Sequence, residues 1–500
     1  MKNFFLYSLL LLITSSFYAQ APSINWQKCL GGTGSDGAGD VRQTSDGGYI
    51  VVGQTYSNDG LVSNNRGGSD CWLVKLNSTG TVQWQKTFGG SEFDSASSVR
   101  QTSDGGFIVI GNTSSNNFDV SGNTGETDAW VVKLSNLGVI EWQKTIGGSG
   151  TDFETSIEQT TDGGYILSGY ANSTDGIFAS GAGCFIIKLN STGVIQWQKM
   201  ISTVGSFMNR VKQTSDGGFI AAGFLNVSST NTDYQIVKLN SLGTIEWQKY
   251  YGGSSFDFAN DIQQTTDGGF IVTGYTSSTD NNVTQNNGLD DAWILKLNNL
   301  GDLQWQKCFG GSDKEDAVSI QQTIDGGYVA CGYTKSNDGM VTGYQGADDF
   351  WILKISNVGN LLWQKTLGGN NRDRASCIRQ TTDNGFIVAG LTRTQNNGDV
   401  TNLYGTQDFW LVKLSPDNLK VNDFSSINDL KIYPNPVKDL LYFNSENKII
   451  SFEVYDITGR ILNSNKVIGN SVDLSNLKTG NYLLKLYTND SVINSKIIKE

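Results

Sequence analysis

The chain has 500 residues, of which 36 are Lys or Arg and 48 are Asp or Glu, so its formal net charge is −12. It contains no histidine, which excludes imidazole bases, Ser-His-Asp triads and His-ligated zinc sites. The acidic balance argues against nucleic acid or an anionic membrane as a partner. Hydrophobic residues make up 38% of the chain, which is enough to build sizeable cores.

The first twenty residues have the organisation of a secretory signal peptide. Lys2 supplies a positive start, and a predominantly apolar run spans residues 4–13. That run is too short to cross a bilayer as a helix, and the small residues Ser16 and Ala19 then offer a cleavage site. No later segment is apolar for the length of a membrane span. The sequence therefore predicts that residues 1–20 are removed and that the exported protein has no transmembrane segment.

Seven repeats follow, each marked by the tripeptide Trp-Gln-Lys. Successive copies are 58, 58, 55, 50, 58 and 58 residues apart, and periods near 50 are typical of solenoids, propellers and arrays. Three other motifs recur in phase with it: Gln-Thr, Asp-Gly-Gly, and Lys-Leu or Lys-Ile. The Trp-Gln-Lys copies begin at Trp26, Trp84, Trp142, Trp197, Trp247, Trp305 and Trp363.

Each repeat is predicted to form four β-strands, as the second one illustrates. Its strands are expected at 97–102, 107–112, 129–134 and 139–146, with a tight Asp-Gly-Gly turn at 104–106. β-Branched residues are frequent in these segments, and no window shows a sustained helical period. Seven four-stranded units predict an all-β fold in which residues 21–415 form a seven-bladed β-propeller.

The two ends of the repeat region predict how such a propeller closes. The chain enters with a lone fourth strand at 24–30 and leaves after the third strand of the last repeat, at 409–414. We therefore expect the N-terminal strand to complete blade seven, which hides two sheet edges. An open solenoid is the alternative, and it would not need this permutation.

A different module follows a predicted linker at 416–430. Residues 431–500 have the pattern of a small antiparallel β-sandwich, with a Tyr-Pro-Asn-Pro opening, an Asp-Ile-Thr-Gly-Arg turn and a Leu-x-x-Gly-x-Tyr close. The motif residues are Tyr433, Pro434, Asn435, Pro436, Gly459, Arg460, Gly480 and Tyr482. With these motifs the segment resembles the type A C-terminal sorting domain of type IX secretion in Gram-negative bacteria.

That resemblance implies a destination and a partner. It implies handling by the type IX secretion machinery, passage through the outer membrane, and either release or surface attachment. The repeats at 24–415 in turn resemble propeller-like repeats found upstream of such domains, and some of those proteins carry endoglucanase-type names. No catalytic motif of an endoglucanase is found in this sequence.

One recurring acid is the candidate ligand site. It follows the Gly-Gly that ends each fourth strand in six repeats, and Ser206 replaces it in the fourth. The six acids are Asp36, Asp94, Asp152, Asp257, Glu315 and Asp373. Because first strands line a propeller channel, these acids should ring its mouth on the face that carries the long loops. They predict a site for cations or sugar hydroxyls; alternatively, each carboxylate fixes its own loop through backbone N–H groups.

The sequence favours binding over catalysis. Six near-equivalent acids do not single out an acid and a base for glycoside hydrolysis, and no catalytic residue, metal site or cofactor is predicted. The six cysteines are interpreted as free buried thiols from their placement. We therefore expect a secreted or outer-membrane-surface protein that binds a glycan or a surface protein. The alternatives are a carboxylate-dependent glycan hydrolase and a purely structural surface protein.

Overall fold

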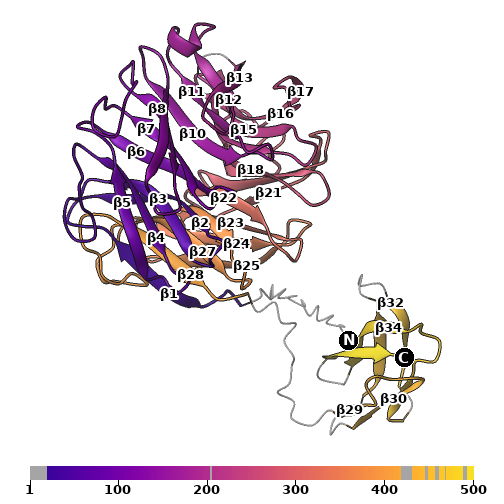
Figure 1. Cartoon of the computed structure of the whole chain (residues 1–500). Coiled ribbons are helices and arrows are strands. Elements are labelled where there is room, and N and C mark those ends of the chain that lie inside the picture. The colour runs from indigo at the N-terminus through magenta and orange to yellow at the C-terminus, as the bar shows by residue number, and fades with distance from the viewer. Residues whose placement is uncertain are drawn as a thin grey trace, which may run out of the picture. The chain divides into compact units, whose positions relative to one another are not determined.

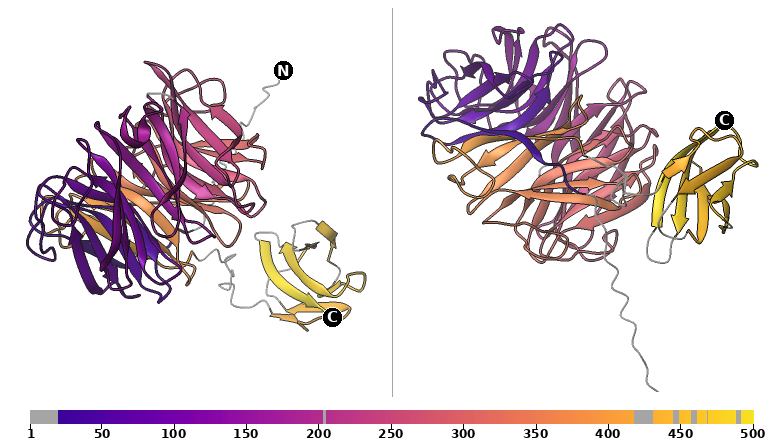
Figure 2. Two further views of the ribbon diagram at one scale, coloured as in Figure 1. Left: turned by 45° about the horizontal axis from the view of Figure 1, so that its top comes forward. Right: turned by 90° about the horizontal axis from the view of Figure 1, so that it is seen from below.

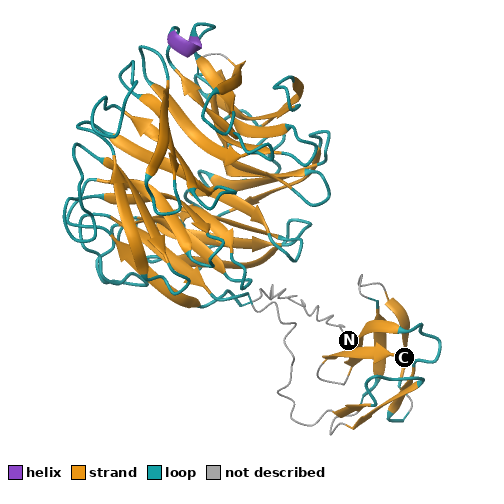
Figure 3. Cartoon of the chain, viewed as in Figure 1, coloured by secondary structure: helices purple, strands orange, loops and turns teal. Residues whose placement is uncertain are grey.

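A computed structural model describes residues 20–202, 205–417, 431–444, 449–456, 461–467, 469–487 and 492–500. The chain divides into two compact units, Met1–Asp417 and Asn418–Glu500. Strands form nearly all of the regular structure, joined in the described part by one short 3-10 helix, η1 (Gly176–Phe178) (Figure 3). Most of the predicted signal peptide, residues 1–19, lies outside the described residues. Within the described residues no helix is long and apolar enough to cross a membrane.

In the described part of the first unit, seven four-stranded antiparallel sheets follow one another along the chain (Figure 1). The first contains β2 (Asp36–Gln43), β3 (Tyr49–Thr55), β4 (Asp70–Leu76) and β5 (Val82–Phe88). The second contains β6 (Asp94–Gln101), β7 (Phe107–Thr113), β8 (Asp128–Leu134) and β9 (Ile140–Ile146). The third contains β10 (Asp152–Gln159), β11 (Tyr165–Ala171), β12 (Gly183–Leu189) and β13 (Ile195–Ser202).

The next three sheets repeat this order. The fourth contains β14 (Phe207–Gln213), β15 (Phe219–Ser228), β16 (Asn231–Leu239) and β17 (Ile245–Tyr251). The fifth contains β18 (Asp257–Gln264), β19 (Phe270–Thr276), β20 (Asp291–Leu297) and β21 (Leu303–Phe309). The sixth contains β22 (Glu315–Gln322), β23 (Tyr328–Thr334), β24 (Asp349–Ile355) and β25 (Leu361–Leu367).

The seventh sheet joins the two ends of the repeat region. It contains β26 (Asp373–Gln380), β27 (Phe386–Thr392) and β28 (Asp408–Leu414), and its fourth strand is β1 (Ile24–Leu30). β1 runs antiparallel to β28 with Leu30 opposite Phe409, and Figure 2 shows this indigo strand beside the orange ones. The indole N–H of Trp410 donates to the Gln27 side chain at 2.8 Å. The expected pairing of the N-terminal strand is thus present.

The Gln-Thr motif forms the same hydrogen bond between every two neighbouring sheets. In the first sheet, the Ser45 N–H donates to the side-chain oxygen of Gln101 in the second, at 2.8 Å. The bond recurs from sheet to sheet, and Thr382 of the seventh donates to Gln43 of the first at 2.8 Å. The accepting residues are Gln43, Gln101, Gln159, Gln213, Gln264, Gln322 and Gln380. The first strands also contact one another in order, and β26 contacts β2.

The other recurring motifs stabilise each sheet internally. The lysine of Lys-Leu or Lys-Ile pairs with the aspartate of the facing turn in all seven sheets, for example Lys75 with Asp46 at 2.9 Å. Hydrogen bonds from Thr44 and this lysine outweigh the effect of burial, and the pKa of Asp46 falls to about 2. Third-strand tryptophans donate to the glutamine of Trp-Gln-Lys, as Trp72 does to Gln85 at 2.9 Å.

The strands of the second repeat lie close to their predicted positions, with one difference. The first strand begins at Asp94, three residues before the predicted start. Asp94 pairs with Thr113 of the second strand, which extends the ladder toward the loop, and a bulge between Ala96 and Ser98 then shifts the register. The Asp94 N–H also donates to the Ser69 carbonyl of the first sheet at 2.7 Å. The recurring acid is therefore the first residue of the strand and not part of the preceding loop.

The second unit contains two antiparallel sheets. One has β29 (Lys431–Tyr433), β30 (Leu440–Asn444) and β33 (Ser471–Asp473). The other has β31 (Ser451–Tyr455), β32 (Ile461–Lys466), β34 (Gly480–Tyr487) and β35 (Val492–Lys499). Buried residues of both sheets, among them Leu441, Val454 and Leu484, form one apolar core, which agrees with the predicted sandwich.

Candidate functional site

The six predicted acids stand at equivalent places, one at the start of each first strand, and all are buried. They are not brought together into one cluster, because each belongs to a different sheet. Asp36 accepts the Gly32 N–H at 2.9 Å and the hydroxyls of Thr55 and Ser57 at 2.5 and 2.8 Å. The other five acids likewise accept a hydrogen bond from the N–H of the second glycine in their own Gly-Gly: Asp94, Asp152, Asp257, Glu315 and Asp373.

This bonding favours the second interpretation of the acids. Each carboxylate joins the loop before its strand to the end of the second strand, and buried acceptors that satisfy several donors are costly to remove. A ligand role for the six acids stays a prediction. It would require these carboxylates to exchange bonds that they already make within their own sheets.

A second set of acids lies at the starts of the third strands, and sequence reasoning missed it. All are buried except Asp233, which is half-buried and is the third residue of its strand. Its members are Asp70, Asp128, Asp233, Asp291, Asp349 and Asp408, with Gly183 in the third sheet. The Oδ1 atom of each is buried without a hydrogen-bond partner. Burial raises the pKa of Asp70 and Asp349 to about 7 and that of Asp291 to about 6. The sequence does show this set, as an Asp that recurs two residues before each third-strand tryptophan.

A strip of aromatic rings lies between the third, fourth and fifth sheets, at the end of the first strands where the acids stand. Its rings are Tyr170, Phe207, Phe224, Phe258 and Tyr275, all partly exposed. The ring centroids of successive members are 4.4, 5.1, 4.3 and 5.0 Å apart. Phe207 faces Phe224 across one sheet, and Phe258 faces Tyr275 across the next. We call these five residues the aromatic strip.

Polar groups follow the aromatic strip in the sixth and seventh sheets. Asp316 accepts the amide N–H of Asn260 at 2.7 Å. The guanidinium of Arg374 lies 4.0 Å from the ring centroid of Tyr333, the residue opposite Asp316. Burial raises the pKa of Asp316 to about 7, against the opposing effect of Arg374. At neutral pH this carboxyl can therefore both donate and accept a hydrogen bond.

The fourth sheet, which contributes Phe207 and Phe224, has a short connection between its second and third strands. Its second and third strands extend into a tight hairpin, so that only residues 229–230 join them, whereas residues 277–290 join the same strands in the fifth sheet. The same repeat carries Ser206 in place of the recurring acid. The departures of the fourth repeat from its neighbours thus coincide with the centre of the aromatic strip.

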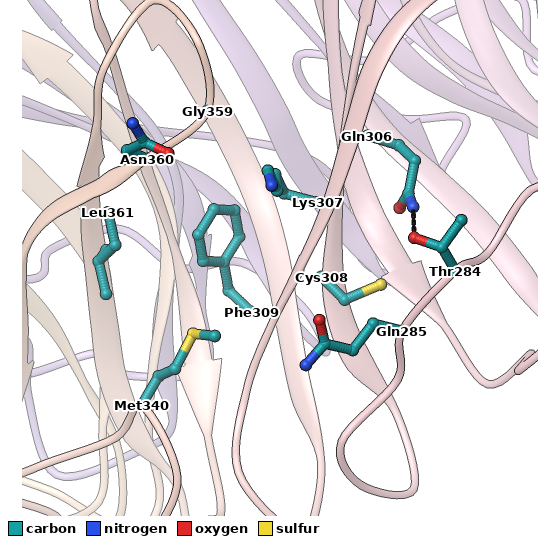
Figure 4. A pocket seen from close by; sticks show the side chains of 10 residues that line it. All are labelled: Thr284, Gln285, Gln306, Lys307, Cys308, Phe309, Met340, Gly359, Asn360 and Leu361. Atoms are coloured by element: carbon teal, nitrogen blue, oxygen red, sulfur yellow. Dashed lines mark hydrogen bonds between the residues drawn. The ribbon is translucent and has the colours of Figure 1, made fainter. Parts of the chain in front are cut away.

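Two cavities lie elsewhere in the first unit. One of about 390 Å³ lies between the fifth and sixth sheets and is lined by Lys307, Phe309 and Met340, among others (Figure 4). There the Gln306 amide donates to the Thr284 hydroxyl and its oxygen accepts from Trp293, so this amide group already has partners. The other cavity, of about 430 Å³, is lined by first strands of six sheets.

All six cysteines are free and buried, as expected from their placement. Burial raises the pKa of Cys29 and Cys377 to about 12. Thiols of that kind are poor nucleophiles at neutral pH. They pack in the apolar cores of the sheets, and the Cys377 thiol also donates to the Asp40 carboxylate at 3.0 Å.

In the C-terminal unit, the Tyr-Pro-Asn-Pro motif is hydrogen-bonded to the last strand, β35. The Asn435 amide donates to the Lys496 carbonyl at 2.9 Å, and its oxygen accepts from the Ile498 N–H at 2.8 Å. The Tyr482 hydroxyl donates to the Lys478 carbonyl at 2.7 Å. Pro434 and Pro436 follow cis peptide bonds. Gly459 and Arg460 lie outside the described residues.

The family comparison decides what this unit is. Residues 431–500 match the family model of the secretion system C-terminal sorting domain. This segment is a type IX sorting domain. The chain that carries it is a secreted or cell-surface protein of a Gram-negative bacterium. The sorting domain covers 70 of the 500 residues, because the match begins at 431 and ends at 500.

Solved structures similar to the chain are remote in sequence. An extracellular domain of a two-component system from B. thetaiotaomicron is 12% identical over 96% of this chain and 60% of its own, with a TM-score of 0.40. PorZ from Porphyromonas gingivalis is 10% identical over 96% and 75%, with a TM-score of 0.32. An ancestral GH74 enzyme is 11% identical over 95% and 64%, with a TM-score of 0.42. No curated protein matches the sequence.

Proposed function

We propose that this protein is a glycan-binding module of the cell surface or the medium, delivered by its sorting domain. The seven sheets would form a closed seven-bladed propeller, and the ligand would lie across the aromatic strip at one mouth of its channel. The glutamine bonds that run from the first sheet to the seventh and back support the closed ring. The partly exposed rings of the strip support the binding role.

The aromatic strip is the observation that carries this proposal. Pyranose rings have apolar C–H faces and polar hydroxyl rims, so they suit apolar aromatic surface that ends in hydrogen-bonding groups. Here five partly exposed rings lead to Asn260, Asp316 and Arg374. The two-residue hairpin at 229–230 stands where the fifth sheet has a loop of residues 277–290, which supports access to the rings.

The test is binding of soluble polysaccharides and oligosaccharides to the purified protein on a glycan array, followed by calorimetry. Phe258 is central in the strip, contacting Phe224 and Tyr275. We expect Phe258→Ala to weaken glycan binding by about tenfold or more, as loss of an aromatic anchor does. Tyr404→Ala is the matched control, because Tyr404 is an aromatic residue that is 56% exposed in a loop outside the strip. Binding that survives Phe258→Ala unchanged would contradict the assignment.

A carboxylate-dependent glycan hydrolase is the second candidate, and Asp316 is the observation that favours it. A carboxyl whose pKa is raised to about 7 beside a sugar-binding surface has the property required of a general acid. This function predicts release of reducing sugar from the bound polysaccharide, abolished by Asp316→Asn. Binding without release assigns the protein to the first function.

A further inference from the structure

A second group of polar side chains lies at the other end of the first strands, away from the aromatic strip. The residue before each Gln-Thr motif occupies the same place on every first strand. In order of the sheets these residues are Arg42, Arg100, Glu158, Lys212, Gln263, Gln321 and Arg379. Four cations and one acid give this ring a net charge of 4 − 1 = +3. That sign is opposite to the charge of −12 on the whole chain.

Most of this ring lines one cavity. The cavity of about 430 Å³ is bounded by Arg42, Lys212 and Arg379, by Glu158, and by glutamines of the first strands. Glu158 is neutralised by Arg100, whose guanidinium lies 3.0 Å from its carboxylate. Arg42 forms an ion pair with Asp40 at 3.2 Å, so it lends the cavity less positive charge than an unpaired cation does.

Arg379 is the group that lacks a counter-ion. One guanidinium nitrogen donates to the Ser319 hydroxyl at 2.8 Å and to the Ile378 carbonyl at 2.6 Å. The other nitrogen, Nη2, is buried without a partner, and the residue is only 7% exposed. Among the described residues no carboxylate forms an ion pair with Arg379. A buried guanidinium group without an anion is costly, so the site is suited to receive one.

The neighbouring side chains offer further donors. Lys212 is 3.6 Å from its nearest carboxylate, Asp261, and burial lowers the pKa of this lysine. Gln263 and Gln321 use their side-chain oxygens to accept the backbone N–H groups of Gln322 and Gln380, both at 2.8 Å. Their amide N–H groups have no bond within the described part of the chain, so both glutamines present donors.

We propose that this cavity is a binding site for one oxyanion group, held by Arg379, Lys212 and Arg42 with the amides of Gln263 and Gln321. The chemistry fits phosphate, sulfate or the carboxylate of a sugar acid, because all three accept charge-assisted hydrogen bonds. The site is independent of the aromatic strip, and its failure would leave the proposed glycan function intact.

The experiment is calorimetric titration of the full chain with sodium phosphate, sodium sulfate and sodium glucuronate, each at constant ionic strength set with chloride. The inorganic and sugar-acid titrations distinguish the two sources of the anion. We expect one site per chain. Arg379→Gln should weaken binding by about tenfold or more, and it places at this position the residue that the fifth and sixth sheets already carry.

Two further variants complete the test: one should change the anion affinity in the opposite direction, and one should leave it unchanged. Glu158→Gln removes the acid of the ring and should tighten binding of the same anion. Lys28→Gln removes an exposed lysine of β1 and should change nothing. The proposal is overturned if none of the three anions binds, if Arg379→Gln binds as tightly as the unaltered chain, or if Glu158→Gln binds more weakly.

Discussion

The acids that begin the third strands place ionisable groups where water cannot reach them. Asp349 accepts the Gln345 N–H through one oxygen at 2.6 Å, and its other oxygen has no partner. Burial, and then the charges of Asp373 and Asp399, raise the pKa of Asp349 to about 7. An unfolded aspartate titrates near 4. The folded chain therefore holds a proton on Asp349 at a pH where the unfolded chain has lost it.

Stability should consequently fall as the pH rises from about 4 to about 7 through Asp349. Asp349→Asn, which cannot ionise, should be more stable than the unaltered chain by about 1–2 kcal/mol at pH 7.5. The advantage should vanish near pH 4, where Asp349 is protonated in both states. Thermal melting across this range measures the difference.

Asp325→Asn in the same sheet supplies the opposite control. Its bonds to Lys354 and Thr323 lower the pKa of Asp325, so the stabilisation it provides is present above about pH 4 and is lost on acidification. This variant should be destabilised at pH 7.5 and less so at low pH. An Asp349→Asn advantage that is equal at both pH values would refute the titration argument.

Residues that recur in every repeat were predictable as structure, and residues that break the repeat were not predictable as sites. Trp-Gln-Lys and Asp-Gly-Gly indicated strands and turns because the same local packing is needed seven times. The aromatic strip depends on Phe207 and Phe258, whose places hold Gly37 and Ser95 in the first two sheets. Only the spatial adjacency of unrelated sheets reveals it. The cations near the ends of the first strands were also missed, because the residue type at that position changes from one repeat to the next.

At the scale of elements, β1 is the strand on which the seventh sheet depends. It covers β28, and Cys29 packs with Trp363, Phe386 and Trp410 in one apolar core. Without β1, the backbone groups of β28 that face it would lose their partners, and the edge of the sheet would be open.

Deleting residues 21–30 should therefore lower the free energy of unfolding of the first unit by more than about 3 kcal/mol, because a paired strand and part of a core are lost together. Gln27→Ala, which removes the bonds of this side chain to Trp410 and to the Asp399 carbonyl but leaves the strand in place, should cost about 1–2 kcal/mol. Denaturant unfolding of both variants measures the two losses of unfolding free energy. A deletion variant as stable as the unaltered chain would show that β1 does not close the ring.

At the scale of the molecule, folding and delivery reside in different parts of the chain. Every strand of the seven sheets lies within residues 24–414, and the last of them pairs with the first. The sorting domain has a core of its own, built from both of its sheets. Hydrogen bonds between strands of the described residues stay within one unit or the other. The two units are therefore expected to be separable.

A chain ending at Ser415 should fold normally and yet fail to leave the cell. The predicted signal peptide carries a chain across the inner membrane only, so the shortened protein should accumulate in the periplasm. Conversely, residues 416–500 fused to an unrelated folded passenger with a signal peptide should send it outside in a type IX host, and the passenger without them should stay inside. Fractionation followed by melting of the periplasmic protein measures both effects.

Normal surface or medium levels of the shortened protein would show that export does not depend on the sorting domain. A periplasmic but unfolded product would show that the first unit needs the second to fold.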